Sequence, residues 1–210
     1  MFSKATYEQR RADLRARMEG GLLLLLGNNE SSMNFADNWY HFRQDSSFLY
    51  FFGLNQPELA AVVDVDEDRD TIFGDELTID DIFWMGDLPT IAERAEQVGV
   101  TDIRPLGSLA ETLAAATAAG RPIHFLPPYR ADNELRLHGL LGIPPREAAD
   151  RASLDFIRAV IDQRSIKSAE EIAELDRAVD TSVDMHTAAI RMARPGMLES
   201  EIAEIGRAHV

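Results

Sequence analysis

The hydrophobic residues at the start of the chain predict a helix followed by a buried strand. Tyr7, Leu14 and Met18 share one helical face among charged residues, so residues 5–18 are predicted to form an amphipathic helix. The run Leu22–Leu26 is apolar at every position and lies next to glycines, which is typical of a strand buried on both faces. A sheet that contains such a strand needs cover from other elements on each side.

The next apolar segments predict a hairpin. Ala60–Val65 is expected to form a strand and Thr71–Phe73 its partner, because an acidic turn separates them. Phe48–Phe52 is aromatic, but its length does not decide between a strand and a short helix. Ile82–Met85 is a further short apolar segment.

Beyond Pro89 the pattern alternates between helices and strands. The predicted helices cover residues 91–98, 109–119, 134–141 and 154–162, and the predicted strands cover residues 102–104 and 123–126. Helix–strand alternation beside a hairpin predicts an α/β domain with a mixed β-sheet that is flanked by helices.

The last long helix carries the clearest local signals. Ser168 is followed three residues later by Glu171, which makes a capping box, and Pro195 with Gly196 ends the helix. The apolar positions recur at steps of three and four: Ile172, Leu175, Val179, Val183, His186, Ile190 and Ala193. The chain from residue 168 onward is too short to bury a core of its own. We therefore expect this helix to fray, to dock on the first domain or to promote association.

Composition narrows the classes of function. The net charge is -15 and the pI is near 4.7, which disfavours binding to nucleic acid or to a membrane surface. The chain contains no cysteine, which excludes disulfides, thiol catalysis and thiolate metal sites. The N-terminus lacks the apolar core of a signal peptide, and no apolar run is long enough to span a membrane. We therefore expect a cytoplasmic protein.

Missing motifs weigh against a nucleotide enzyme, an α/β hydrolase and a zincin. The sequence has no phosphate-binding glycine loop, no Gly-x-Ser-x-Gly elbow, no His-Glu-x-x-His helix and no dinucleotide fingerprint. The acidic run Asp64–Asp70 resembles a calcium loop, but Arg69 stands where the sharp turn needs glycine. A solvated hairpin turn is therefore expected there.

Three residues have a functional and a structural interpretation. His186 could be a metal ligand, but a histidine on an apolar helical stripe is expected to be a satisfied interior residue, and Asp184 points to a different face. Trp84 lies in a short apolar segment, where packing in the core is expected. Asp37 precedes a run of aromatic residues and is expected to be a turn or N-cap aspartate.

Four segments together resemble the aminopeptidase P (Xaa-Pro aminopeptidase) family, within the creatinase and prolidase group. The first two are Ala36-Asp37-x-x-Tyr40-x-Phe-Arg43-Gln-Asp-Ser-Ser-Phe48 and Tyr50-Phe-Phe-Gly53-Leu-Asn-Gln-Pro57-Glu58. The third is Phe83-Trp84-Met-Gly86. The fourth is Arg164-Ser-Ile-Lys167-Ser-x-Glu-Glu-Ile-x-x-Leu175, with His186 and Arg194-Pro-Gly-Met197. Each segment alone is only moderately specific for this family, but the four segments in this order make the resemblance strong.

The resemblance implies a fold and a reaction. The fold is an N-terminal mixed sheet with flanking helices, followed by a pita-bread catalytic domain. The reaction is removal of an N-terminal residue that precedes proline, so the substrates are peptides with proline second. The resemblance also implies two metal ions, often manganese, held by two Asp, one His and two Glu. None of these ligands matches a residue of this chain, so no catalytic and no metal-binding residue is assigned here.

The resemblance implies a role for two residues of the N-terminal domain. In a homo-oligomer, a dimer or a tetramer, this domain would reach the neighbouring subunit's active site and narrow its entrance. Asp37 and Trp84 match positions of that wall, which would act in trans on the substrate.

The expected domain organisation has three parts. Residues 1–150 form the N-terminal domain, residues 151–167 a linker helix region, and residues 168–210 the start of a catalytic domain that is cut short. Residues 204–210 resemble translated sequencing adapter, so an artefactual tail is expected. The chain is then the front of a Xaa-Pro aminopeptidase and inactive alone.

Two other interpretations stay open at this point. One is a naturally short binding or scaffold module without catalysis. The other is the front part of a prolidase or creatinase-like hydrolase, although Gln56-Pro57-Glu58 and the segment around Asp37 favour aminopeptidase P.

Overall fold

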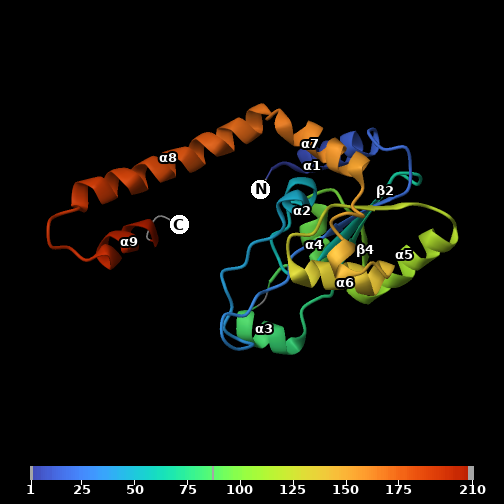
Figure 1. Cartoon of the computed structure of the whole chain (residues 1–210), viewed down its shortest axis with the longest axis horizontal. Coiled ribbons are helices and arrows are strands. Elements are labelled where there is room, and N and C mark those ends of the chain that lie inside the picture. The colour runs from blue at the N-terminus through green and yellow to red at the C-terminus, as the bar shows by residue number, and fades with distance from the viewer. Residues whose placement is uncertain (1, 87, 208–210) are drawn as a thin grey trace. The chain divides into compact units, whose positions relative to one another are not determined.

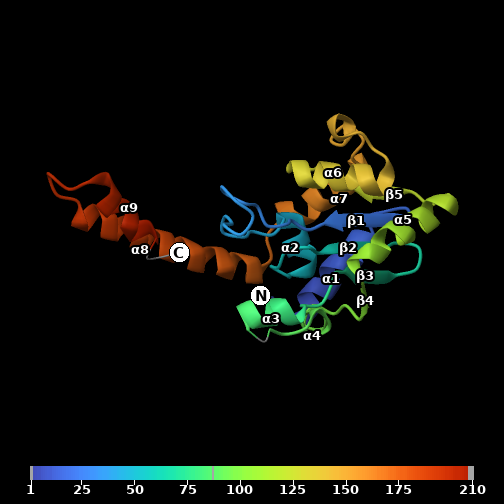
Figure 2. The ribbon, with the colours of Figure 1, turned by 90° about the horizontal axis from the view of Figure 1, so that it is seen from below.

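The computed structural model describes residues 2–86 and 88–207. The chain divides into two compact units, and the division falls between Arg164 and Ser165. Residues 208–210, which belong to the 204–210 tail singled out above, lie outside the described residues. Figure 1 labels the helices of both units, Figure 2 adds labels for the strands of the first unit, and each unit is described by itself below.

The first unit is built on a mixed five-stranded sheet in the order β4-β3-β2-β1-β5. The strands are β1 (Leu22–Leu26), β2 (Ala60–Asp64), β3 (Arg69–Phe73), β4 (Asp102–Arg104) and β5 (Ile123–Phe125). β2 is antiparallel to both β1 and β3, while β5 runs parallel to β1 and β4 parallel to β3. Four strands therefore point one way and β2 alone points the other. The mixed sheet flanked by helices that the sequence predicts is confirmed.

Helices cover both faces of this sheet. Helices α1 (Lys4–Arg15), α2 (Ser46–Phe52), α4 (Ile91–Glu96) and α7 (Leu154–Ser165) contribute buried residues to one core, and α5 (Leu109–Ala118) and α6 (Ala131–Leu141) contribute to a second. Leu23 and Leu25 point into the first core, whereas Leu22 and Leu24 point into the second. Because side chains alternate along a strand, cover on both faces explains why the whole run Leu22–Leu26 is apolar.

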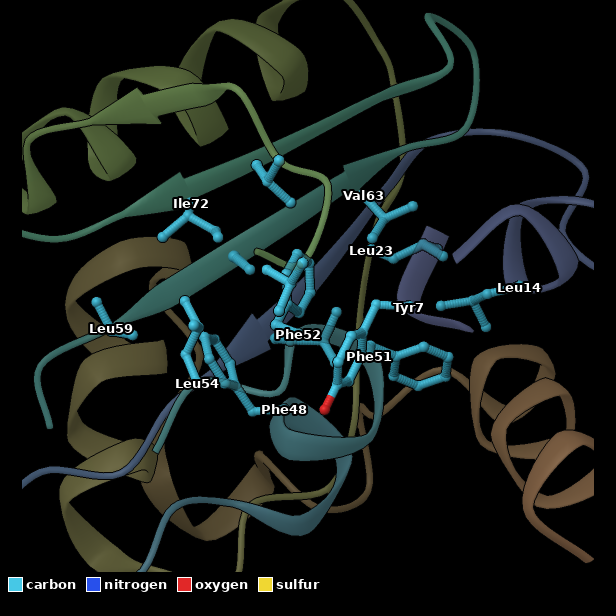
Figure 3. Close-up of a cluster of buried hydrophobic side chains, with 14 of the residues drawn as sticks. Tyr7, Leu14, Leu23, Phe48, Phe51, Phe52, Leu54, Leu59, Val63 and Ile72 are labelled. Carbon is cyan, nitrogen blue, oxygen red and sulfur yellow. The ribbon is translucent and has the colours of Figure 1, made fainter. Parts of the chain in front are cut away.

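The short aromatic segment that the sequence left undecided is helix α2. Asp45 caps its start, because its side chain accepts hydrogen bonds from the amides of Ser47 and Phe48, each at 2.8 Å. Gly53 ends it in the left-handed conformation, with φ at 65°. The side chains of Phe48, Phe51 and Phe52 are fully buried against the sheet, in the cluster that Figure 3 shows around Leu23, Val63 and Ile72.

A buried arginine connects several elements of the first unit. The side chain of Arg11 on α1 has no exposed surface, and its Nε donates to Asp70 Oδ2 at 2.6 Å. Its two terminal nitrogens donate to the backbone oxygens of Phe51 and Val98, at 2.8 and 2.7 Å. Its charge is thus paired and hydrogen-bonded, as a buried charge requires.

The second unit contains α8 (Ala169–Met192) and α9 (Glu199–Arg207). The capping box of α8 is confirmed: Ser168 Oγ accepts from the Glu171 amide at 3.2 Å, and the Glu171 carboxylate accepts from the Ser168 amide at 2.9 Å. The apolar stripe of α8 is exposed, with half or more of Leu175, Val179 and Val183 open to solvent. The expectation that His186 is an interior residue is wrong for this chain, because its side chain is exposed along this uncovered stripe.

No helix in the described part of the chain combines the length and the apolar character that a membrane crossing needs.

Candidate functional site

The turns that carry the candidate residues gather at one end of the sheet, here called the carboxyl edge. Strands β1, β3, β4 and β5 all end there, and β2 begins there, since Leu26 pairs with Ala60 and Ala60 pairs with Phe73. In open α/β sheets, ligand sites form outside the carboxyl ends of the strands. The segment after β1 and the segment after β3 both leave the sheet at this edge.

The segment after β1 forms a small hairpin loop, residues 29–43. Ser32 and Trp39 form an isolated antiparallel bridge, and the Met33 amide donates to the Asn38 backbone oxygen at 2.7 Å. The Tyr40 amide donates to the Ser31 backbone oxygen at 2.9 Å. These bonds close the loop on itself. Asp37 lies in the turn at its tip and its side chain is exposed, so the predicted turn aspartate is confirmed.

The hairpin loop exposes an unusual number of large apolar side chains around Asp37. Phe35 and Tyr40 are 60% and 59% exposed. Met33 and Trp39 are each about half exposed. Exposed apolar side chains that cluster on a short segment are typical of a binding surface.

The segment after β3 leads to α3 (Ile79–Met85), which carries Trp84. Thr78 and Asp81 form a capping box at its start. The Thr78 hydroxyl and amide donate to the Asp81 carboxylate, and these hydrogen bonds lower the pKa of Asp81. The expected core packing of Trp84 is wrong: 82% of the residue is exposed, and its ring meets Phe83 edge to face at 5.2 Å between centroids. Ile79 and Phe83 on the same helix are also largely exposed, at 86% and 77%.

The structure places Asp37 and Trp84 on separate elements of the same unit. In Figure 1 the hairpin loop and α3 project from the same end of the unit, beyond α2 and α4. The view of Figure 2, turned by 90°, separates them. The hairpin loop and α3 are therefore separate projections of the first unit.

A buried polar network fastens the base of the hairpin loop. The side chain of Gln44, only 1% exposed, accepts from the Asn28 amide at 2.6 Å and from the Asp45 amide at 2.8 Å through Oε1. Its Nε2 donates to the Gln56 backbone oxygen at 2.7 Å. Asn28 is 2% exposed, and its Nδ2 donates to the Arg43 backbone oxygen at 2.9 Å. The two ends of the loop are thereby joined to each other.

Helix α6 and the segment before it hold the same base from the other side. Tyr129 OH accepts from Asn28 Nδ2 at 2.9 Å. Arg136 Nη1 donates to the Gly27 backbone oxygen at 2.8 Å and to Asn133 Oδ1 at 3.2 Å. Burial lowers the pKa of Arg136, although the charge of Asp132 opposes that shift. A hollow of about 40 Å³ adjoins Tyr129 and Asn133, enough for one or two water molecules.

Sequence reasoning missed most of this network. Gln44 and Asp45 lie in the segment Arg43–Phe48, which drew attention only as a motif, and the structure gives its residues mainly structural tasks. Asn28 follows the leucine run directly and carries no motif of its own. The contribution of Arg136 to the network had no local signal, because its partner at Gly27 lies 109 residues away in the chain.

The acidic run Asp64–Asp70 forms a hairpin turn between β2 and β3, as predicted, but it is solvated only in part, because Asp64 is 4% exposed. Arg121 pairs with the carboxylates of Asp64 and Asp66. Burial raises the pKa of Asp64, but the hydrogen bonds from Arg121 and from the Glu67 and Asp66 amides outweigh it, so the net shift is downward. Among the described residues there is no grouping of three or more His, Cys, Asp or Glu side chains that could hold a metal ion. The described side chains therefore do not fit the two-metal centre that the resemblance implies.

Comparison with known proteins agrees with this geometry. A mixed sheet covered by helices on both faces defines an α/β domain. The family model for the aminopeptidase P N-terminal domain matches residues 7–124. The chain belongs to the aminopeptidase P family.

Relatives extend the match beyond the N-terminal domain. A probable Xaa-Pro aminopeptidase of Aspergillus terreus is 28% identical over 194 residues, which cover 90% of this chain and 40% of that protein. The Xaa-Pro aminopeptidase of Escherichia coli is 26% identical over 94% of this chain and 47% of its own length. The solved low-pH form of E. coli aminopeptidase P has a TM-score of 0.80 at 25% identity, over 100% of this chain and 49% of that chain. This chain thus spans less than half the length of these relatives.

Proposed function

We propose that this chain is the N-terminal portion of a Xaa-Pro aminopeptidase, a hydrolase that removes an N-terminal residue preceding proline. The observation that carries the proposal is the match of residues 7–124 to the N-terminal domain of aminopeptidase P. Relatives with the name Xaa-Pro aminopeptidase that align over 90% or more of the chain support it. The substrates are peptides with proline second, and the proposed location is the cytoplasm. The charge of -15 supports a protein without nucleic-acid or membrane partners.

The metal centre of the proposed reaction lies outside the described residues. Two divalent ions, with manganese as the proposed metal, would supply the Lewis-acid chemistry of the hydrolysis. The described part of the chain offers no grouping of ligands for such a pair. We therefore expect the 210-residue chain to be inactive by itself, and no step of the reaction is assigned to its residues.

The proposed task of the first unit is to shape the entrance of a neighbouring subunit's active site in a homo-oligomer. Asp37 would attract the free α-amino group of the substrate, and Trp84 would limit the width of the cleft. Two features support this: Asp37 is exposed at the tip of a closed hairpin loop, and Trp84 is 82% exposed. Exposed aromatic side chains such as Phe83 next to it suit an interface between subunits.

The test is metal-dependent hydrolysis of a tripeptide with proline second. The present chain and a clone lengthened at its C-terminus would be measured in parallel with Mn²⁺. Only the lengthened clone is expected to cleave. Cleavage by the present chain alone would contradict the proposal, and cleavage of Xaa-Pro dipeptides but not of the tripeptide would replace it with a prolidase-like function.

The role in trans is tested in the lengthened clone by Asp37→Ala and Trp84→Ala. Each variant should raise KM for the tripeptide several-fold and leave the unfolding midpoint nearly unchanged, because both side chains are exposed. Matched controls are Glu67→Ala, in the exposed turn between β2 and β3, and Leu154→Ala at the start of α7. Unaltered kinetics in both test variants would refute the role in trans.

A further inference from the structure

We infer that Gln44 is a positioning residue for Asp37: its buried amide fixes the base of the hairpin loop, residues 29–43, and thereby the direction in which the tip presents its carboxylate. What Asp37 does there rests on the proposed function. The mechanical role of Gln44 does not, and it is argued and tested separately below.

The side-chain amide of Gln44 forms hydrogen bonds with the backbone at both ends of the hairpin loop. Oε1 accepts from the amide of Asn28, where the chain enters the loop, and from the amide of Asp45, where the chain leaves it. Nε2 donates to the backbone of Gln56, in the segment that leads back to β2. One side chain thus links three stretches of backbone, with 1% of its surface exposed.

The backbone around Gln44 is shaped to accept this side chain. A Cβ on Gly27 would lie 2.9 Å from Gln44 Nε2 and 2.7 Å from the Leu59 backbone oxygen. Glycine at position 27 therefore leaves the room that the amide occupies. From the other side, Arg136 holds the Gly27 backbone oxygen and Tyr129 holds the Asn28 side chain.

The loop beyond this base holds itself together. The bridge between Ser32 and Trp39 and the bond from the Tyr40 amide to Ser31 make it a closed hairpin. A closed hairpin moves as one body, so its orientation is set where it joins the sheet. Asp37 lies nine positions after Asn28, a stretch that spans at most about 30 Å, so a small rotation at the base would displace the tip by several ångström.

The experiment uses the absence of cysteine from the sequence, which allows a single label without background. A nitroxide is attached at Asp37→Cys, and its mobility is measured by electron paramagnetic resonance with and without Gln44→Met, a substitution of similar volume that removes all three bonds. The matched control is the same label at Glu67→Cys, in the exposed turn between β2 and β3.

We expect Gln44→Met to shorten the rotational correlation time of the label at position 37 by about twofold or more, with no change at position 67. A fall in the thermal unfolding midpoint with an unchanged spectrum at position 37 would overturn the inference, because Gln44 would then serve stability alone. In Gln44→Glu the correlation time at position 37 should lie between those of the parent chain and of Gln44→Met, because a carboxylate still accepts from the amides of Asn28 and Asp45.

If Gln44→Met does not fold, hydrogen exchange on the unaltered chain tests whether Gln44 fixes the base of the hairpin loop. The amides of Asn28 and Asp45, which both donate to Gln44, should exchange about 100-fold or more slowly than the amide of Asp37. Equal rates would show that the base is open and would overturn the inference. Neither measurement involves peptide hydrolysis, so its outcome is independent of whether the proposed function holds.

Discussion

The two units of this chain each contain a helix with clear capping signals and apolar side chains, but only the helix in the first unit is buried. In the first unit α2 has a capped start, a glycine end and three aromatic side chains that are completely buried. In the second unit α8 has a full capping box and a regular apolar stripe, yet none of its residues is buried. Capping and periodicity therefore define a helix, whereas burial depends on partners that only the rest of the fold supplies.

The comparison is tested most strongly by removing one apolar side chain from each unit. Phe52→Ala should lower the free energy of unfolding of the first unit by about 3–5 kcal/mol, because the ring is fully buried. Val179→Ala on α8 should cost less than about 0.5 kcal/mol, since the residue is 56% exposed. Urea unfolding of the 210-residue chain measures both. A cost at Val179 similar to that at Phe52 would mean that α8 is buried in solution.

The next effect concerns charged side chains. Arg11→Met should lower the free energy of unfolding by about 3 kcal/mol, because it removes the buried donor to the backbone oxygens of Phe51 and Val98 and leaves Asp70 with Arg15 as its remaining partner. The control is Arg177→Met on α8, whose pair with Glu174 is exposed and is expected to contribute less than about 0.5 kcal/mol. Thermal unfolding followed by circular dichroism compares the two. Equally small losses in both variants would show that Arg11 does not hold the elements of the first unit together.

A smaller effect is expected from the cap of α8. Ser168→Ala removes the side-chain acceptor for the Glu171 amide and should destabilise the helix by about 1 kcal/mol. The loss should appear as reduced helical circular dichroism, with the unfolding midpoint of the first unit unchanged. Thr181→Ala, in the exposed middle of α8, is the control and should not lower helicity. Unchanged helicity in Ser168→Ala would show that packing, and not the cap, maintains this helix.

The smallest expected effect is on how the free energy of unfolding changes with pH, through Asp64 in the turn between β2 and β3. The pKa of Asp64 is lowered in the folded chain, so its ionised form contributes stability above the unfolded pKa of about 3.9. That contribution is lost as the pH falls through the lowered folded pKa. Asp64→Asn should therefore make the free energy of unfolding less dependent on pH between roughly 5 and 2. An identical pH dependence in Asp64→Asn and the parent chain would rule out this source.

Most of the sheet could be predicted from the sequence because its strands carry strong local patterns. Leu22–Leu26 is apolar throughout, and the pairing of Ala60–Asp64 with Arg69–Phe73 follows from a short acidic turn. The aromatic run at 48–52 stayed undecided because it is too short to distinguish a strand from a short helix. The cap at Asp45 and the glycine at 53 would have indicated a helix.

The candidate surface could be predicted only in part. Asp37 was correctly placed in a turn, because a short polar side chain before aromatic residues favours one. Trp84 was expected in the core, since an apolar segment gives no information on whether another element covers it. Gln44 could not be assigned a role, because its partners at Asn28 and Gln56 are distant in sequence and become neighbours only in the folded chain.

The short outer strands of the sheet have a consequence for how this protein can self-associate. Strand β1, made of five leucines, would be prone to aggregate if it lay at the border of the sheet, but it pairs with β2 on one side and β5 on the other. The border strands β4 and β5 have three residues each, which leaves a second molecule few free backbone groups to extend. Copies of this chain are therefore expected to meet through exposed side chains and not to fuse their sheets into a fibril.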